Sequence, residues 1–252
     1  MKRNTQQRRR AIIDLLSEQG EISVEYFASH FDTSEVTVRK DLAILESNGL
    51  VLRKHGGAIL MPQERLEVNG KVSKRKMAIA RLAATLLKDH DRIVIDSGTT
   101  TAAMLPEIKQ LRGLLVMSNS LAVANELLDL ENEPTLLLTG GTWDKQSQSF
   151  QGQMAEQMLR SYNFDLAFVG AAGIDIHRGT TTFNELTQLT RVMAETSRKV
   201  VVLAESEKFQ RKMPNLELSW QCVSTLVTDS GIATEYKEQL ESSGIEVLVA
   251  QA

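Results

Sequence analysis

The sequence predicts an α/β protein with an N-terminal winged helix-turn-helix and a larger, mainly parallel α/β domain. Three observations predict this fold class. Residues 1–60 contain three short helical patterns followed by a glycine-containing hairpin. Residues 61–73 have no periodic apolar pattern, which is typical of a linker. Over residues 74–252, helical patterns alternate with continuous apolar runs, as in a parallel sheet with helices on both faces.

The composition is that of an ordinary globular protein, with 252 residues, 42% hydrophobic and 24% charged. The single cysteine, Cys222, excludes an internal disulfide and a cysteine-based zinc cluster. It also fits a reducing compartment. The apolar runs are far shorter than the ~18 residues of a membrane helix, and the basic N-terminus lacks the apolar core of a signal peptide. We therefore expect a cytoplasmic protein with no membrane contact, no metal and no cofactor.

The net charge of −3 does not by itself suggest a nucleic-acid binder. Residues 1–60 hold 9 basic and 8 acidic residues, and the remainder holds 20 and 24. This asymmetry is too small to assign a partner. The basic residues are clustered, however, and binding to DNA depends on the local field of one face.

The first 60 residues contain the signals of each helix and of the hairpin. The apolar spacing predicts a first helix from Thr5 to Gln19, ended by Gly20, and a second helix over 24–30. Residues 32–34 form a turn with an N-cap signal, and a third helix extends to about Asn48. LVLRKHGGAIL then predicts two short strands around a Gly-Gly turn.

The third helix has the pattern of a DNA-recognition helix. Val38, Leu42 and Leu45 share one face, which leaves short polar and cationic groups on the other. Such groups can contact base edges and phosphates of double-stranded DNA. A solvated amphipathic helix is the alternative, and the preceding helix, turn and basic hairpin favour DNA. The candidate DNA-contacting residues here are Ser34, Thr37, Arg39 and Lys40.

The hairpin adds a basic tip to this domain. Arg53, Lys54 and His55 precede the two glycines, of which Gly57 is a candidate for close approach to a groove wall. The cations would supply contacts to phosphate. The alternative is a turn with no contact to DNA. The cations of Arg8–Arg10 oppose the dipole of the first helix; a nearby phosphate backbone or a solvated basic end would each explain them.

Residues 74–252 read as alternating helices and strands. The expected helices cover 74–88, 100–110, 121–130, 151–160, 184–197 and 233–243. The expected strands cover 92–96, 114–118, 135–139, 164–170, 199–204, 223–228 and 245–249.

IVIDSGTTTAAM, residues 93–104, predicts a strand, a small hydroxyl-rich turn and the start of a helix. Backbone N–H groups and the helix dipole make such a turn an anion site, although a capped helix is the alternative. Residues 118–120 and Lys208 follow other expected strands. Ligands gather beyond the carboxyl ends of parallel strands, so we expect these segments to converge.

SEVTVRKDLAILESNGLVLRKHGGAIL resembles the signature segment of the DeoR-type (DeoR/GlpR family) bacterial repressors of sugar catabolism. The resemblance continues through DSGTTT, SNSLAVANEL, LTGGT, SQSFQGQMAEQ, FDLAFVGAAGID, TTFNE and ESEKF. FDTSEVTVRKDL and TTFNE are most similar to the glucitol and other polyol-operon repressors.

The resemblance implies a sensor domain similar to ribose-5-phosphate isomerase and glucosamine-6-phosphate deaminase. In that family the Gly/Ser/Thr loop and a lysine hold a phosphate, and other groups surround the sugar. Asp96 and Asp175 are equally well explained as turn-forming residues, and Glu185 as a first-turn helix carboxylate. The implied effector-binding residues are Asp96, Ser97, Gly98, Thr99, Thr100, Thr101, Ser118, Asn119, Ser120, Gly141, Asp175, Glu185 and Lys208.

We expect no catalytic residues. The related isomerases carry a carboxylate-rich turn where this chain has GAAGID, with Ala171 and Ala172 in place of acids. Two alternatives remain: a sugar-phosphate isomerase or deaminase with a DNA-binding head, and a constitutive DNA-binding protein whose second domain only oligomerises.

The resemblance implies a repressor of a carbohydrate or polyol operon, released from operator DNA by a phosphorylated sugar or polyol. Symmetric half-sites imply a homo-oligomer, either a dimer or a tetramer. The ESEKF segment departs from the family's usual Asp-Ser-Ser-Lys-Phe, because Glu207 stands beside Lys208. We expect this extra acid to weaken the attraction of Lys208 for phosphate.

Overall fold

A computed structural model describes residues 5–47, 50–54, 56–60, 72–145, 147–182, 187–211 and 213–251. The chain divides into two compact units, Met1–Gly70 and Lys71–Ala252. Across the described parts of both units, none of the helices has the length and apolar character needed to cross a membrane.

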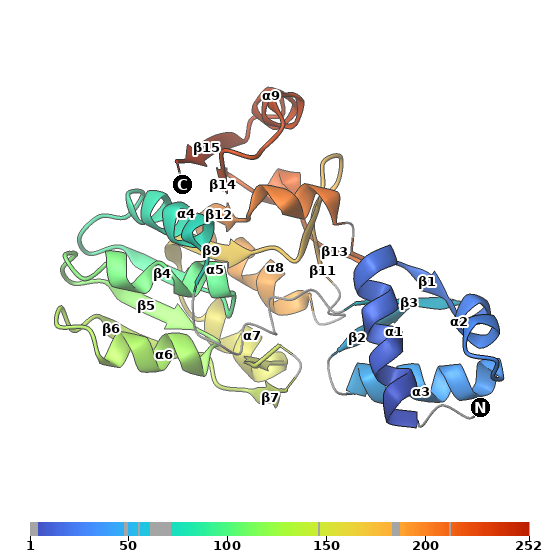
Figure 1. Ribbon diagram of the computed structural model, residues 1–252. Helices are drawn as coiled ribbons and strands as arrows, with labels where there is room; N and C mark the ends of the chain where they lie inside the picture. The colour runs from blue at the N-terminus through green and yellow to red at the C-terminus, as the bar shows by residue number, and fades with distance from the viewer. Residues whose placement is uncertain are drawn as a thin grey trace. The chain divides into compact units, whose positions relative to one another are not determined.

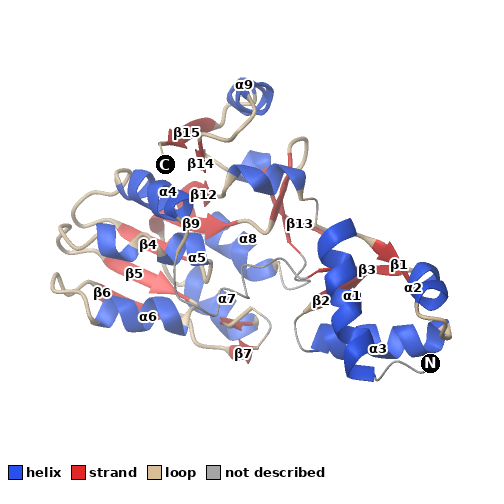
Figure 2. Ribbon diagram, in the orientation of Figure 1, coloured by secondary structure: helices blue, strands red, loops and turns tan. Residues whose placement is uncertain are grey.

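The first unit is a winged helix-turn-helix, as predicted (Figures 1 and 2). Its sheet has the order β1-β3-β2, and both pairings are antiparallel. The elements are α1 (Thr5–Gln19), β1 (Ile22–Ser23), α2 (Val24–His30), α3 (Glu35–Ser47), β2 (Val51–Lys54) and β3 (Gly57–Leu60).

The core of the first unit explains why these segments fold together. Ile12 of α1, Phe27 of α2 and Leu42 of α3 are fully buried in one cluster. The apolar stripe expected on the third helix therefore faces the core. Ser23 begins α2 as its N-cap, because its hydroxyl accepts a hydrogen bond from the backbone N–H of Tyr26 at 3.1 Å.

The second unit is built on a seven-stranded sheet whose strands are all parallel, in the order β15-β14-β12-β9-β4-β5-β6. This confirms the predicted mainly parallel α/β domain. The strands are β4 (Arg92–Ile95), β5 (Leu115–Ser118), β6 (Thr135–Leu138), β9 (Phe164–Gly170), β12 (Ser197–Leu203), β14 (Thr225–Asp229) and β15 (Glu246–Ala250).

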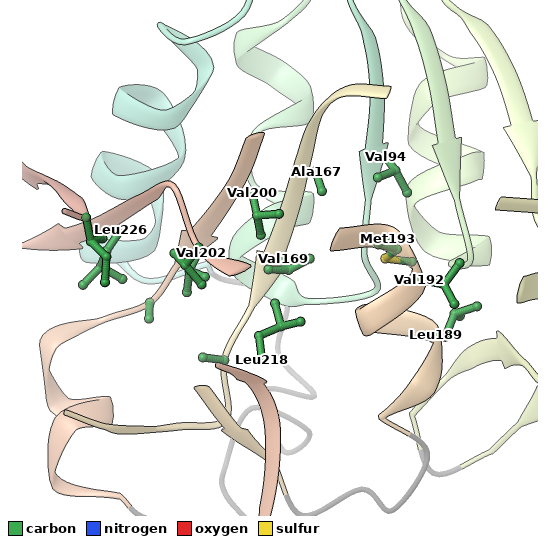
Figure 3. Close-up of a cluster of buried hydrophobic side chains, with 14 of the residues drawn as sticks. Val94, Ala167, Val169, Leu189, Val192, Met193, Val200, Val202, Leu218 and Leu226 are labelled. Carbon is green, nitrogen blue, oxygen red and sulfur yellow. The ribbon is translucent and has the colours of Figure 1, made fainter. Parts of the chain in front are cut away.

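Helices cover both faces of this sheet. The helices are α4 (Lys74–Ala84), α5 (Thr99–Ala102), α6 (Leu121–Leu128), α7 (Gln153–Arg160), α8 (Gln188–Glu195) and α9 (Thr234–Ser242). One core contains side chains of α7, α8 and α9, and the other contains side chains of α4 and α6. Figure 3 shows Leu189, Val192 and Met193 of α8 beside Val94 and Val169 of the sheet.

The helix predicted over 100–110 is wrong in length. α5 has a single turn, and a separate 3-10 helix, η2 (Leu105–Glu107), follows it. Pro106 lies in η2. Proline has no N–H to continue an α-helical ladder, which explains the break.

Two small β structures were not predicted. β7 (Thr142–Asp144) and β8 (Ser149–Gln151) form a hairpin. β10 (Gly173–Asp175), β11 (Gly179–Thr182) and β13 (Asn215–Ser219) form a separate antiparallel sheet. These strands have three to five residues, which is too short for a clear alternating pattern.

Candidate functional site

The exposed start of α3 carries the predicted hydroxyl groups. The Ser34 hydroxyl accepts a hydrogen bond from the backbone N–H of Thr37 at 3.2 Å. The two side-chain hydroxyls also lie 2.9 Å apart in a shared hydrogen bond. Ser34 is therefore the N-cap of α3, and the pair fixes both hydroxyls at the end of the helix.

The cations on this side of the unit are exposed, and two of them pair with acids. The Arg39 guanidinium lies 2.6 Å from the Glu35 carboxylate, and that of Arg53 lies 2.6 Å from Glu46. Exposed ion pairs contribute only ~0.2–1 kcal/mol, so a DNA phosphate can replace either acid. Lys40 is exposed as well.

The two remaining hairpin cations cannot be placed, because His55 and the side chain of Lys54 lie outside the described residues.

The structure favours a packing role for Gly57 over the expected groove contact. Gly57 is buried, and a Cβ there would lie 2.6 Å from the carbonyl oxygen of Ile22 in the neighbouring strand. Only glycine allows the two backbones to approach this closely. The exposed residue of the pair is Gly56, whose φ of +83° is the left-handed conformation that favours glycine.

The basic start of α1 is partly a structural feature. Arg8 and Arg9 donate hydrogen bonds to the two carboxylate oxygens of Asp41, at 2.6 and 2.8 Å. Asp41 is only 2% exposed. These two ion pairs join α1 to α3. They explain the presence of Arg8 and Arg9 without either a phosphate backbone or a solvated basic end.

In the second unit, the expected anion-binding residues follow strands of the parallel sheet. From β4 the chain adds β5 and β6 on one side, and then β9, β12, β14 and β15 on the other. The topological switch point, where the strand order reverses, therefore lies between β4 and β9. In sheets of this kind, ligands bind beyond the carboxyl ends of the strands at this point.

Asp96 stands at the switch point and connects its two strands. One carboxylate oxygen accepts a hydrogen bond from the backbone N–H of Gly170 at 2.6 Å. The other accepts from the backbone N–H of Gly98 at 2.9 Å and from the Thr101 hydroxyl at 2.6 Å. This arrangement favours the turn-forming alternative for Asp96 over contact with a sugar.

Within the SGTTT turn, the hydroxyl groups divide into two sets. Thr100 and Thr101 are buried, whereas Ser97 is half-buried and Thr99 is exposed. The single turn of α5 makes a much smaller dipole than the longer helix predicted, so the expected dipole contribution is reduced. For an anion at this turn, most of the attracting positive charge would therefore come from side chains.

A buried lysine that sequence reasoning missed supplies such a charge. Lys76 of α4 is 2% exposed, and its ammonium donates a hydrogen bond to the Thr99 hydroxyl at 3.1 Å. Buried lysines are rare unless they are paired. The only sequence signal was its place in KRKMAIA, where it reads as one of three cations at a helix start.

The start of α4 also contacts the loop after β12. The Ser73 hydroxyl caps α4 by accepting from the backbone N–H of Lys76, and it donates to the Glu205 carboxylate at 2.8 Å. Glu205 precedes the 3-10 helix η3 (Ser206–Gln210), which contains Lys208. The first turn of α4 therefore contacts the SGTTT turn after β4 through Lys76, and the loop after β12 through its N-cap Ser73.

Lys208, in the middle of η3, is 2% exposed. The start of the same 3-10 helix is fixed by Asp229, whose carboxylate accepts a hydrogen bond from the backbone N–H of Ser206 at 2.7 Å. Burial raises the pKa of Asp229, but hydrogen bonds from Ser206 and Gly231 outweigh it and hold the pKa below its usual value. Glu207, which was expected to weaken the attraction of Lys208 for phosphate, pairs with Arg211 at 2.8 Å.

The loop after β5 contains a buried acceptor that no described residue satisfies. Ser118, Asn119 and Ser120 are all buried. Ser118 and Ser120 accept backbone N–H groups within the turn, and Ser120 caps α6. The Asn119 amide nitrogen donates to the carbonyl oxygen of Phe150 at 3.4 Å, whereas Oδ1 has no hydrogen-bond partner among the described residues.

The remaining predicted effector residues differ in their surroundings. Gly141 follows β6 with φ +108°, and a Cβ there would lie 2.6 Å from the carbonyl oxygen of Gln151. Asp175 ends β10, and its carboxylate accepts the backbone N–H of His177 at 3.0 Å. This favours the turn-forming alternative for Asp175. Glu185 lies outside the described residues.

Glu217 of β13 is a carboxylate that the sequence did not indicate. It accepts a hydrogen bond from the Thr190 hydroxyl of α8 at 3.1 Å. Burial, and then the nearby charge of Asp96, raise its pKa to about 7, against the weaker effects of Thr190, Thr180 and Arg191. The sequence NLELS gives no sign that this position is desolvated.

The turn after β9 has no acid at its start. Ala171 is buried in the core that contains α7 and α8, and Ala172 is half-buried. These two positions therefore supply no group that can move a proton.

Two family models match most of the chain. Residues 8–64 match a DeoR-like helix-turn-helix domain, and residues 71–230 match a DeoR C terminal sensor domain. Both matches fall within the two compact units.

Full-length relatives carry the names of transcription regulators. A "putative aga operon transcriptional repressor" of Escherichia coli O157:H7 is 35% identical over 97% of this chain and 94% of the relative. A "lactose phosphotransferase system repressor" of Lactococcus lactis subsp. lactis is 32% identical over 94% of this chain and 95% of the relative.

Among solved structures, ribose 5-phosphate isomerase A from Methanocaldococcus jannaschii is similar over 53% of this chain and 52% of its own. The TM-score is 0.39 and the identity 18%. Likeness at this level concerns the fold alone.

Proposed function

Because the chain belongs to the DeoR family of transcriptional repressors, we propose that it represses a carbohydrate or polyol catabolic operon. In this proposal a phosphorylated sugar or polyol binds the second unit and releases the protein from its operator. The observation that carries the proposal is the pair of buried lysines, Lys76 and Lys208, beside the loops after β4 and β12.

The positions of the two loops support a phosphate between them. β9 lies between β4 and β12 in the sheet. Neighbouring strands are ~4.8 Å apart, so the two loops are separated by about 10 Å. A phosphate has several acceptor oxygens, and charge-assisted hydrogen bonds from ammonium groups are among the stronger ones in proteins. In this proposal Lys76, Lys208 and the Ser97–Thr99 turn donate to it.

The sugar or polyol part would extend toward the loop after β5. Oδ1 of Asn119 is an acceptor without a donor in the described part of the chain, and the residue is only 3% exposed. A buried acceptor without a donor costs ~1–3 kcal/mol, and a hydroxyl group of the effector would remove that cost. This is the chemistry that a sugar or polyol chain offers.

The name of one relative supports a carbohydrate signal. That relative is named as the repressor of a lactose phosphotransferase system. Both this relative and that of Escherichia coli O157:H7 are named as repressors. Ala171 and Ala172 supply no acid or base. We therefore propose that the bound metabolite is held and not converted.

Operator recognition in this proposal requires a homo-oligomer. A single winged unit gives a small contact area, and symmetric half-sites are matched by a symmetric protein. Dimer and tetramer both satisfy this requirement. Light scattering with size-exclusion chromatography measures which one forms.

A thermal-shift panel tests effector binding directly. The panel contains hexose, pentose and polyol phosphates, each beside its unphosphorylated parent. A ligand at 100 times its dissociation constant adds ~2.7 kcal/mol of stability, so at least one phosphorylated compound should raise the Tm of the second unit while its parent does not. A panel in which no compound shifts the Tm would instead support a constitutive DNA-binding protein.

A further inference from the structure

The outward face of α3 carries one large apolar side chain near its start. Val36 lies in the first turn of the helix and is 60% exposed. A single exposed valine needs no explanation on most surfaces. This one lies on the helix that a winged helix-turn-helix inserts into DNA.

Polar groups surround Val36 on this face. Ser34 and Thr37 share a hydrogen bond and fix the end of the helix. Arg39 is paired with Glu35, and Lys40, one turn after Val36, is exposed. The first turns of α3 therefore present a small methyl surface between hydroxyl groups and cations.

The major groove of DNA offers one matching apolar group. Each base pair shows donors and acceptors there, but only thymine shows a methyl group, at C5. We propose that Val36 packs against the C5-methyl group of one thymine in each operator half-site and so determines the base at that position. This inference rests on the DNA-binding role of α3.

The size of the contact sets the expected effect. Burial of one methyl group changes affinity about fourfold. Two half-sites in one symmetric operator give about sixteenfold, because contacts at separate sites are roughly additive in free energy.

The test begins with the full-length protein and a library of randomised duplexes. After selection, each enriched thymine is replaced by deoxyuridine, which lacks only the methyl group, and affinity is measured by fluorescence anisotropy. One symmetric pair of thymines should lose about sixteenfold on replacement. With Val36→Ala the same replacement should cost less than twofold.

Two further variants sharpen this test. Val36→Thr keeps the shape and one methyl group, so it should retain part of the deoxyuridine effect. Ile44→Ala, a second apolar residue of α3 that is 39% exposed, should retain all of it. Thermal unfolding of each variant shows that the first unit remains folded.

The possible failures are distinguishable. The inference is overturned if no thymine is sensitive to loss of its methyl group, or if Val36→Ala leaves the sensitivity unchanged. The same holds if Ile44→Ala removes it. A selection that enriches no sequence would overturn the DNA-reading role of α3 as well.

Discussion

The ammonium group of Lys76 lies 3.1 Å from the hydroxyl oxygen of Thr99, and the lysine is almost completely buried. This contact joins the first turn of α4 to the loop after β4. The hydroxyl of Ser73, three residues before Lys76, donates a hydrogen bond to the carboxylate of Glu205 in the loop after β12. The start of α4 therefore contacts both segments between which we propose that the phosphate of the effector binds.

Replacement of Lys76 should remove the effector response and spare operator binding. Lys76→Met keeps the length of the side chain but loses the charge and its donors. A hydrogen bond from a charged group is worth ~1.5–3 kcal/mol, so affinity for a phosphorylated effector should fall about 10- to 100-fold. Titration calorimetry measures the loss, and anisotropy on operator DNA checks that binding remains.

Lys74→Met is the matched control, since Lys74 is exposed on the same turn. It should leave effector affinity within twofold of the unsubstituted protein. Equal losses in the two variants would show that the effect is one of general charge.

Asp41 should be needed for the stability of the first unit. Asp41→Asn weakens the buried pairing with Arg8 and Arg9. Removal of one partner from a buried ion pair costs about 3 kcal/mol, and operator binding should weaken as α1 separates from α3. Differential scanning calorimetry of the full chain measures the stability. Asp14→Asn, an exposed acid on α1, should have little effect, and equal Tm values for the two variants would contradict this account.

Asp96→Ala separates the turn-forming role of Asp96 from an effector-binding role. The substitution leaves the backbone N–H groups of Gly98 and Gly170 without their acceptor. Each loss costs ~1–3 kcal/mol, so the second unit should lose about 3 kcal/mol of stability. Chemical unfolding measures it, with the exposed Asp129→Ala as control. Unchanged stability together with a lost effector response would instead place Asp96 in the ligand site.

Glu217 should make the second unit less stable as pH rises toward 8. Its folded-state pKa of about 7 lies above the ordinary value of 4.5, so the fold favours the protonated form. The contribution of the protonated group is fully present below pH 4.5 and is lost as pH rises through 7. In Glu217→Gln the Tm should therefore vary less between pH 5 and 8. Glu195→Gln, at an exposed acid, should follow the unsubstituted protein at every pH, and a constant offset for Glu217→Gln would refute the assignment.

The sequence was sufficient for the larger elements because their signals are local. The apolar stripe of α3 and the continuous runs of β9 and β12 repeat over several turns or residues. Short strands such as β10 and β11 carry no such repeat, since three or four residues fit a turn equally well. The break at Pro106 was readable from the sequence and was missed.

The sequence allowed the loops of the candidate site to be grouped, but it did not indicate the residues that contact them from other elements. Strand ends in a parallel sheet meet at one edge, so the loops after β4 and β12 could be grouped from the sequence. Lys76 reaches the site from a helix that precedes the sheet, and Glu217 from a strand of the small sheet. Such contacts depend on tertiary packing. Asp96 and Asp175 were readable only as two alternatives, because a turn aspartate and a ligand aspartate have the same local sequence.

The most direct measurement is release of the full-length protein from operator DNA, followed by fluorescence anisotropy, with paired phosphorylated and unphosphorylated sugars and polyols. The account predicts release by at least one phosphorylated compound and none by its parent. It also predicts that Lys76→Met and Lys208→Met stay on the DNA at the same concentration. Release by an unphosphorylated parent, or full release of both lysine variants, would contradict it.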